Sequence, residues 1–454
     1  MVTISRKEYE SFLQQIQDLT AHIKRLEETI SLLNNKGNSH TSSTPPSHDL
    51  GRSNSNSLRQ SSGRSSGGQK GHVGHTFELV DNPDEIVEYK ADICQGCGAD
   101  LSMVSVSHYT RRQEITLPPI TPLLIEHRSL CKICPACHHS NKGSYPAWIQ
   151  GPIQYGSQIE SLVSYMSVYQ DLPYERICHF LRDWFGLRRI SDGSVDNMLE
   201  RMKQKAAFVY KELQERIQKE PVVGADETGC HVGGKKHWFH VWQSRTITFI
   251  VSFASRSHNV IEKYFPGGFP DSFYVSDCYA SQLKTTAKSH QLCIAHLLRE
   301  LLNFEKSLRS EWSIKMKELL QRAVEFKKNM TEEDYRNPPE QVILINNQLD
   351  ELLTVDYSQF NEKEQALVKR LIKHRASILT FLNHANVPPD NNASERAIRN
   401  VKVKTKVSGQ FRNKEGKGAD RYAKIRSVID TTIKNGQSVY TALCCLANCQ
   451  VKMT

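Results

Sequence analysis

The stretch that decides the fold is Val-Val-Gly-Ala-Asp-Glu-Thr-Gly, residues 222–229. A short apolar run that ends in Asp226 predicts a buried strand whose C-terminal edge carries a carboxylate, where ligand sites of open α/β sheets lie. Acidic residues at strand ends also act as plain turn or cap residues, so this stretch alone leaves that alternative open. Residues 273–277, Phe-Tyr-Val-Ser-Asp, repeat the pattern. If the two strands are neighbours, Asp226 and Asp277 can hold a divalent cation between them.

Further elements on both sides of this stretch predict a mixed domain of strands and helices. We predict strands at residues 222–225, 237–243, 247–253, 273–277 and 291–295, and a helix at 257–265. Residues 297–388 are charged and almost entirely helical in pattern, which predicts an all-α insertion. The sequence Asp-Asn-Asn-Ala-Ser-Glu that follows it is the capped start of a helix. Compensation of the helix dipole would by itself explain Glu395.

The bulk composition indicates a soluble protein of several domains. The chain of 454 residues is too long for one simple core. It lacks both an apolar run long enough for a membrane span and the apolar core of a signal peptide, so we expect a cytoplasmic protein with no membrane partner. The net charge of +10 indicates an anionic partner. Residues 396–435 contain twelve Lys and Arg against three Asp and Glu, so most of this excess follows Glu395.

The N-terminal 33 residues carry a heptad repeat. Heptad positions a are Tyr9, Ile16, Ile23 and Ile30, and positions d are Phe12, Leu19, Leu26 and Leu33. Ile at a with Leu at d favours a parallel two-stranded coiled coil, which predicts a homodimer or a larger assembly. An amphipathic helix packed on its own domain is the alternative. Residues 34–75 are rich in Ser, Asn, Gly and Pro and predict a flexible linker, which leaves that helix little neighbouring core.

Two Cys-x2-Cys pairs predict a zinc-binding domain at residues 76–150. Twelve cysteines in a cytoplasmic chain indicate free thiols and a metal site rather than disulfides. The ligands predicted for one structural Zn²⁺ are Cys94, Cys97, Cys134 and Cys137. Cys131 is the rival for one ligand position, and His138 and His139 are expected to cap the second knuckle. The long separation between the pairs requires the intervening segment to fold back.

Residues 151–220 are helical in pattern, with a break at Pro173 and a turn at Gly186. A helix that ends at Phe185, followed by Ser191 as the N-cap of a second helix, resembles a helix-turn-helix. A plain helical hairpin explains the same pattern equally well.

Three motifs resemble a known family. They are Asp-Glu-Thr-Gly at residues 226–229, Ser-Asp-Cys-Tyr at residues 276–279, and Asn-Asn-Ala-Ser-Glu-Arg-Ala-Ile-Arg at residues 391–399. Together they resemble the DDE transposases of bacterial insertion sequences, in particular insertion-sequence family sixty-six, whose large protein is the transposase C type. The likeness extends over nearly the whole chain, in order, from the zipper helix through the four-Cys domain to the closing Lys-Asn-Gly-Gln-Ser-Val-Tyr.

The resemblance implies a multidomain α+β protein with a ribonuclease-H-like α/β catalytic core at residues 221–440 and a short C-terminal tail at 441–454. It implies that Asp226, Asp277 and Glu395 are the catalytic triad and that their oxygens bind two Mg²⁺ or Mn²⁺ ions. The Cys-x2-His pair of Cys293 and His296 resembles a signature of several transposase groups. We interpret that pair as structural and do not count it as a zinc site.

The basic run after Glu395 predicts contacts with DNA phosphates. The residues proposed for them are Arg396, Arg399, Lys402, Lys404, Lys406 and Arg412. In an extended segment the three lysines would share one face. A strand with solubilising lysines is the alternative, and Arg399, one helical turn beyond Glu395, can instead pair with it.

The function expected from the resemblance is that of a DNA transposase. Such an enzyme binds the terminal inverted repeats of an insertion sequence, cleaves phosphodiester bonds to free 3′-OH ends and joins them to double-stranded target DNA. Accessory proteins of the element are further possible partners. A zinc-containing regulator with an inactive core and a structure-specific nuclease are the alternatives; the first would bind without cleaving, and the second would cleave without joining.

Overall fold

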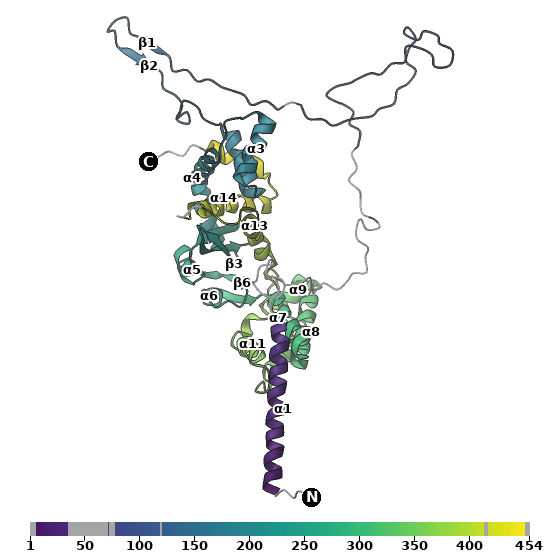
Figure 1. Ribbon diagram of the computed structural model, residues 1–454, viewed down its shortest axis with the longest axis vertical. Helices are drawn as coiled ribbons and strands as arrows, with labels where there is room; N and C mark the ends of the chain where they lie inside the picture. The colour runs from purple at the N-terminus through teal and green to yellow at the C-terminus, as the bar shows by residue number, and fades with distance from the viewer. Residues whose placement is uncertain (1–5, 35–70, 72–77, 119, 413–415, 450–454) are drawn as a thin grey trace. The chain divides into compact units, whose positions relative to one another are not determined.

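The computed structural model describes residues 6–34, 71, 78–118, 120–412 and 416–449 (Figure 1). The chain divides into two compact units, one of residues Ser57–Leu123 and one that contains Met1–Asn56 and Leu124–Thr454. This boundary falls inside the segment predicted as one domain at residues 76–150. No described residue between 78 and 159 is buried, so no apolar core holds that segment together. The linker predicted at 34–75 lies almost wholly outside the described residues.

A five-stranded mixed sheet forms the centre of the larger unit. Its strands are β3 (Val222–Val232), β4 (Lys235–Gln243), β5 (Thr248–Phe253), β6 (Phe269–Ser276) and β7 (Ala287–Leu292). Their order is β5-β4-β3-β6-β7, in which β3, β4 and β5 are antiparallel neighbours and β6 and β7 run parallel to β3. The predicted strands are therefore confirmed, together with the short helix α5 (Asn259–Tyr264) between β5 and β6.

Two strand boundaries differ from the prediction. The strand predicted to end at Asp226 continues to Val232, because Cys230 and Val232 are buried and the chain pairs with β4 across the turn at Gly233 and Gly234. Both turn glycines have positive φ, 55° and 81°, which glycine adopts without steric cost. The strand predicted at residues 291–295 ends earlier, since helix α7 begins immediately after Cys293.

One hydrophobic core joins the sheet to helices from both ends of this unit. The helices before the sheet are α2 (Ser157–Ser164), a π-helical turn (Tyr165–Tyr169), α3 (Tyr174–Phe185) and α4 (Asp192–Ile217), and those after it are α13 (Asn392–Ser408), α14 (Lys417–Lys434) and α15 (Val439–Asn448). Buried Met202 of α4, Trp242 of β4 and Ile429 of α14 belong to the same cluster. The segment before the sheet and the segment after it therefore pack as one body with the sheet.

The segment predicted as a C-terminal tail begins as helix α15, so that prediction is wrong for residues 441–448. The side chain of Leu443 is fully buried, and its carbonyl accepts a hydrogen bond of 3.2 Å from the Ser161 hydroxyl of α2. The apolar face of α15 pairs with a helix far away in the chain, and a sequence pattern alone does not reveal such a partner. Residues 450–454 lie outside the described part.

The predicted turn between α3 and α4 is confirmed. Gly186 ends α3 in the left-handed region at φ 64°, and the Ser191 hydroxyl accepts a hydrogen bond of 3.2 Å from the Ser194 amide at the start of α4. Helix α4 extends to Ile217 because apolar residues on one of its faces, including Tyr210 and Leu213, pack into the core.

The insertion between β7 and α13 is entirely helical, as predicted. It contains α7 (Ile294–Leu308), α8 (Glu311–Lys328), α9 (Glu332–Arg336), α10 (Glu340–Leu353), α11 (Glu362–Lys373), a 3₁₀ turn (Arg375–Ser377) and α12 (Thr380–Asn383). Every residue from 294 to 391 is described, and none of them lies in a strand.

Near the N-terminus, α1 (Arg6–Asn34) forms the predicted helix. Its described side chains at heptad positions a and d are all at least 50% exposed; they are Phe12, Ile16, Leu19, Ile23, Leu26 and Ile30. The side chains of Tyr9 and Leu33 lie outside the described part. Pairing of two such helices stays a prediction. None of the described helices is both long and apolar enough to cross a membrane.

Candidate active site

The register of two parallel strands brings two of the predicted acids together. Strand β3 pairs with β6 so that Val222 lies opposite Phe273 and Gly224 lies opposite Val275. The same offset, continued by two residues, sets Asp226 beside Asp277 just beyond the end of β6. Both side chains stay partly accessible to solvent.

The electrostatics of Asp226 show that three carboxylates occupy one region. Burial raises the pKa of Asp226 well above its usual range, and the negative charges of Glu227, Asp277 and Glu395 raise it further. The amide of Glu227 donates a hydrogen bond of 2.9 Å to Asp226 Oδ1 and offsets part of this effect. Carboxylates that repel one another in a partly buried place are a fitting environment for a divalent cation.

Helix α13 brings Glu395 to the sheet, and Asn391 fastens its start. The Asn391 side-chain amide donates a hydrogen bond of 2.6 Å to the carbonyl of Ala225, the residue before Asp226. Its carbonyl oxygen accepts a hydrogen bond of 2.6 Å from the hydroxyl of Ser394. Asn391 thereby joins the first turn of α13 to β3 and fixes the position from which Glu395 projects.

Gly224 makes this close approach possible. A Cβ atom at that position would lie 2.6 Å from Ser394 Oγ and 2.9 Å from Asn391 Oδ1, distances that real Cβ atoms do not show. The hydrogen at Gly224 is therefore a condition for docking α13 on β3. A glycine within a predicted strand indicates that another segment approaches the backbone closely. The sequence does not show that this segment is α13.

The neighbouring acid Glu227 forms an ion pair with an arginine. Arg256 Nη2 lies 2.6 Å from Glu227 Oε1, and the Gln282 amide donates a hydrogen bond of 2.6 Å to Glu227 Oε2. The guanidinium of Arg256 also stacks on the ring of Tyr279 at 3.7 Å. Burial raises the pKa of Glu227, as does the charge of Asp277, and Arg256 opposes that shift.

Glu395 also belongs to a second group of side chains of types that bind metals. Ligand atoms of Cys293, His296 and Glu395 all lie within 4.8 Å of one another, and among the described residues no other three His, Cys, Asp or Glu side chains do so. His296 Nε2 is 3.7 Å from Glu395 Oε1, which also lies 3.5 Å from Arg299 Nη1. The guanidinium near Glu395 therefore belongs to Arg299 rather than to Arg399. The sequence supplied the Cys-x2-His pair but not its third member.

The basic residues after Glu395 lie on a helix, so the prediction of an extended segment is wrong. Lys404 is buried in α13, and its Nζ donates hydrogen bonds of 2.9 Å and 3.1 Å to the carbonyls of Ser167 and Leu172. Burial lowers the pKa of Lys404 to about 8. Residues two apart in a helix point to different sides. Lys404 therefore points into the protein, whereas Lys402 and Lys406 do not. Lys404 is removed from the predicted DNA contacts.

The other basic residues stay on the surface. The exposed ones are Arg396, Arg399, Lys402, Lys406 and Arg412. The first four follow one another at steps of three, three and four along α13, so they form one band on the helix. We call these four residues the α13 basic band.

The first Cys-x2-Cys pair lies in a tight turn of the smaller unit. The Cys94 amide donates a hydrogen bond of 2.8 Å to the Ala99 carbonyl, and the Gly98 amide donates one of 2.9 Å to the Cys94 carbonyl. Hydrogen bonds from the amides of Gly96 and Cys97 lower the pKa of the Cys94 thiol. A turn that directs amides at a thiol favours the thiolate, the form that binds metal.

The second pair repeats this turn in the larger unit. The Cys134 amide donates to the His139 carbonyl and the His138 amide donates to the Cys134 carbonyl, both at 2.9 Å. His138 has a φ of 56° at the position that Gly98 occupies in the first turn. Amides of Cys137 and Ala136 lower the pKa of the Cys134 thiol. Both Cys-x2-Cys pairs therefore form the same tight turn, with amides directed at the first thiol of each pair.

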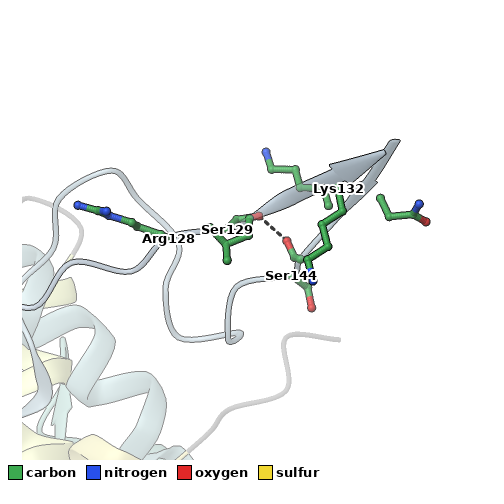
Figure 2. Close-up of a pocket in the computed structure, with 8 residues that line it drawn as sticks. Arg128, Ser129, Lys132 and Ser144 are labelled. Carbon is green, nitrogen blue, oxygen red and sulfur yellow. Dashed lines mark hydrogen bonds between the residues drawn. The ribbon is translucent and has the colours of Figure 1, made fainter. Parts of the chain in front are cut away.

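Cys131 lies outside this turn, on a short hairpin of β1 (Cys131–Ile133) and β2 (Ser140–Lys142). Its sulfur is 2.9 Å from the hydroxyl of Ser140. A pocket of about 510 Å³ lies beside the hairpin. Figure 2 draws the side chains that line it. The pocket is lined by Arg128, Ser129, Leu130, Lys132, Asn141, Lys142, Gly143 and Ser144. It contains three cationic side chains and none of the predicted site residues.

The fold and the site define an α+β protein in which neighbouring strands of the mixed sheet set Asp226 beside Asp277, and the following helix carries Glu395, whose charge acts on Asp226. The family model of the transposase IS66 family matches residues 152–419, which include all three acids. The chain belongs to this family: it is a transposase, an enzyme of mobile genetic elements that acts on DNA. The family is one of DDE transposases, so membership implies the use of a divalent metal. The comparison with curated proteins gave no match.

Proposed function

We propose that this transposase binds the terminal inverted repeats of an insertion sequence, cleaves phosphodiester bonds to free 3′-OH ends and joins those ends to target DNA. The catalytic residues are Asp226, Asp277 and Glu395. The observation that carries this proposal is the parallel register of β3 and β6, which sets Asp226 beside Asp277. The raised pKa of Asp226, to which the charges of both other acids contribute, supports it.

The strand order supports a ribonuclease-H-like core. Three antiparallel strands followed by two strands parallel to the first, in the order β5-β4-β3-β6-β7, agree with the fold that the family resemblance implies. In this arrangement Asp226 lies on the central strand and Asp277 follows its parallel neighbour. The carboxyl end of a parallel pair is where ligand sites of such sheets lie.

The three acids fit Mg²⁺ or Mn²⁺, because hard divalent cations prefer carboxylate oxygens. When two such ions are bound, they activate the attacking oxygen and stabilise the leaving 3′ oxygen of the phosphodiester. The sheet positions the carboxylates of Asp226 and Asp277, and helix α13 positions the carboxylate of Glu395. The neighbouring Glu227 forms an ion pair of 2.6 Å with Arg256. We therefore count three acids, and not Glu227, as metal ligands.

The α13 basic band and Arg412 contact the DNA backbone. The charges of the band follow Glu395 on the same helix, and Arg412 lies just beyond it. Together they neutralise phosphates next to the acids, a salt-sensitive contribution that does not depend on base sequence. Segments outside the catalytic core contribute to assembly of the complex. One structural Zn²⁺ binds to the two knuckles, α1 pairs with a second copy so that two transposon ends are held together, and accessory proteins of the element join the complex.

The test uses purified full-length protein, Mg²⁺, end-labelled DNA that carries the terminal repeats of the element, and a target plasmid. Joined products are expected from the wild type and not from Asp277→Asn or Glu395→Gln, which should still bind the repeats. Cleavage without joining would establish the nuclease alternative. Binding without cleavage would establish the inactive regulator, and full activity of either variant would remove its residue from the site.

A further inference from the structure

We infer that Cys293, His296 and Glu395 form a site for one borderline-soft divalent ion of the Zn²⁺ class, and that this site shares Glu395 with the proposed magnesium centre. The third ligand, Glu395, replaces the purely structural role that the Cys-x2-His pair alone indicated. The three side chains offer a sulfur, a nitrogen and an oxygen within 4.8 Å of one another. This set differs in kind from the all-oxygen group of Asp226, Asp277 and Glu395. Sulfur and imidazole ligands select Zn²⁺ over Mg²⁺.

Two polar atoms of the trio lack a hydrogen-bond partner. His296 Nδ1 and Glu395 Oε1 are buried atoms without one, although buried polar atoms in folded proteins nearly always have one. Glu395 Oε1 has His296 Nε2 at 3.7 Å and Arg299 Nη1 at 3.5 Å, both too far for a good hydrogen bond. A metal ion bound between these side chains would give the Glu395 carboxylate oxygen the partner that it lacks.

The fold holds the trio from two segments about one hundred residues apart. Cys293 precedes α7 and His296 lies in its first turn, while Glu395 lies in the first turn of α13. The Asn391 amide donates a hydrogen bond of 3.2 Å to Cys293 Sγ, and the Ile294 amide donates one of 2.9 Å to the Pro389 carbonyl. The two helix starts are therefore fastened to each other next to the ligands.

The geometry requires only a small contraction. Zn²⁺ binds sulfur at about 2.3 Å and nitrogen or oxygen at about 2.0 to 2.2 Å, so its tetrahedral ligands lie about 3.6 Å apart. Atoms now within 4.8 Å reach that spacing through rotamer shifts of about 1 Å. The Cys293 proton leaves to solvent as the thiolate forms. The partial exposure of His296 and Glu395 leaves the fourth position to water.

Because Glu395 belongs to both proposed metal sites, occupation of one site affects the other. A Zn²⁺ ion on this trio withdraws one carboxylate oxygen from the magnesium centre, so the two metals compete for Glu395. The competition for Glu395 rests on the proposed function, whereas binding of the ion itself does not.

The experiment counts bound metal in the full-length protein without DNA. Protein is saturated with Zn²⁺, freed of excess by gel filtration and assayed for zinc. Cys293→Ser and His296→Asn are each expected to carry one ion fewer than the wild type, and Glu395→Gln is expected to lose that same ion faster to a chelator. Cys230→Ser, which alters a buried thiol on β3, is the matched control and should keep the wild-type count.

Equal zinc content in the wild type, Cys293→Ser and His296→Asn would overturn the site. An unchanged rate of zinc loss in Glu395→Gln would overturn the sharing of Glu395. Circular dichroism of each variant establishes that it is folded, and His296→Asn, at a partly exposed position, provides the second route if Cys293→Ser does not fold. Because no DNA is cut, failure here is distinct from failure of the proposed transposition activity.

Discussion

Replacing Gly224 by alanine tests whether the docking of α13 on β3 positions Glu395. The new Cβ would lie 2.6 Å from both Ser394 Oγ and Gln243 Nε2 and 2.9 Å from Asn391 Oδ1. Ser394 and Asn391 cannot simply rotate away, because they bond to each other and Asn391 holds the Ala225 carbonyl. Relief to an ordinary contact of about 3.4 Å therefore moves the start of α13 by about 0.8 Å, which is the difference between 3.4 Å and the 2.6 Å contact.

A displacement of this size reaches Glu395 in the same helical turn. A misplacement of about 1 Å in a catalytic group costs about 100-fold in rate, and overpacking costs about 1 to 3 kcal/mol of stability. We expect Mg²⁺-dependent cleavage by Gly224→Ala to fall by about 100-fold while binding of the terminal repeats is kept. The rate is measured in single-turnover cleavage of labelled DNA, and binding by gel shift.

Gly229→Ala on the same strand is the matched control. Its Cβ would meet only the ring of Trp238, at an ordinary 3.6 Å, so its cleavage rate should stay near that of the wild type. Wild-type cleavage by Gly224→Ala would refute the docking argument. So would an equal loss in both variants, because the effect would then belong to β3 in general.

Four further predictions concern other parts of the chain. Asp226→Asn should abolish cleavage and, without divalent metal, raise the melting temperature. The raised pKa of Asp226 means that the native state holds a proton which the unfolded state releases, so wild-type stability should fall as pH rises above about 4, and this slope should be weaker in the variant. Cys97→Ser should lower the zinc content; unchanged metal would refute its assignment as a ligand. Lys402→Ala should reduce the salt dependence of DNA binding by about one charge, whereas Lys404→Met should leave it unchanged; equal effects would contradict the burial of Lys404. Deletion of residues 1–33 should lower the mass measured by light scattering, and an unchanged mass would contradict the coiled coil.

The strands, the helix caps and the helical insertion were predictable because their signals are local. Apolar runs that end in Asp226 and Asp277 indicate strands wherever they pack, and Ser191 caps a helix through a bond to an amide three residues away. The family resemblance, carried by short motifs, was confirmed by the family match. Where a strand stops was less predictable, since β3 continues to Val232 only because β4 returns to pair with it.

Several features of the site were decided by tertiary structure alone. Lys404 is buried because α13 turns it toward the carbonyls that follow α2, and no pattern within residues 396–407 shows which lysine faces inward. The pairing of Glu227 with Arg256 likewise depends on the connection after β5.

By itself, the sequence indicated most strands, the helical insertion and the family, and it marked the three acids and the Cys pairs as candidates, because each of these signals lies in residues close together in the chain. Only the tertiary structure brought Glu395 against Cys293 and His296, made Gly224 the point at which α13 meets β3, and gave Asn391 its bond to the Ala225 carbonyl. These contacts join segments about one hundred or more residues apart. Their geometry follows from how helices and sheet pack together, which no local pattern encodes.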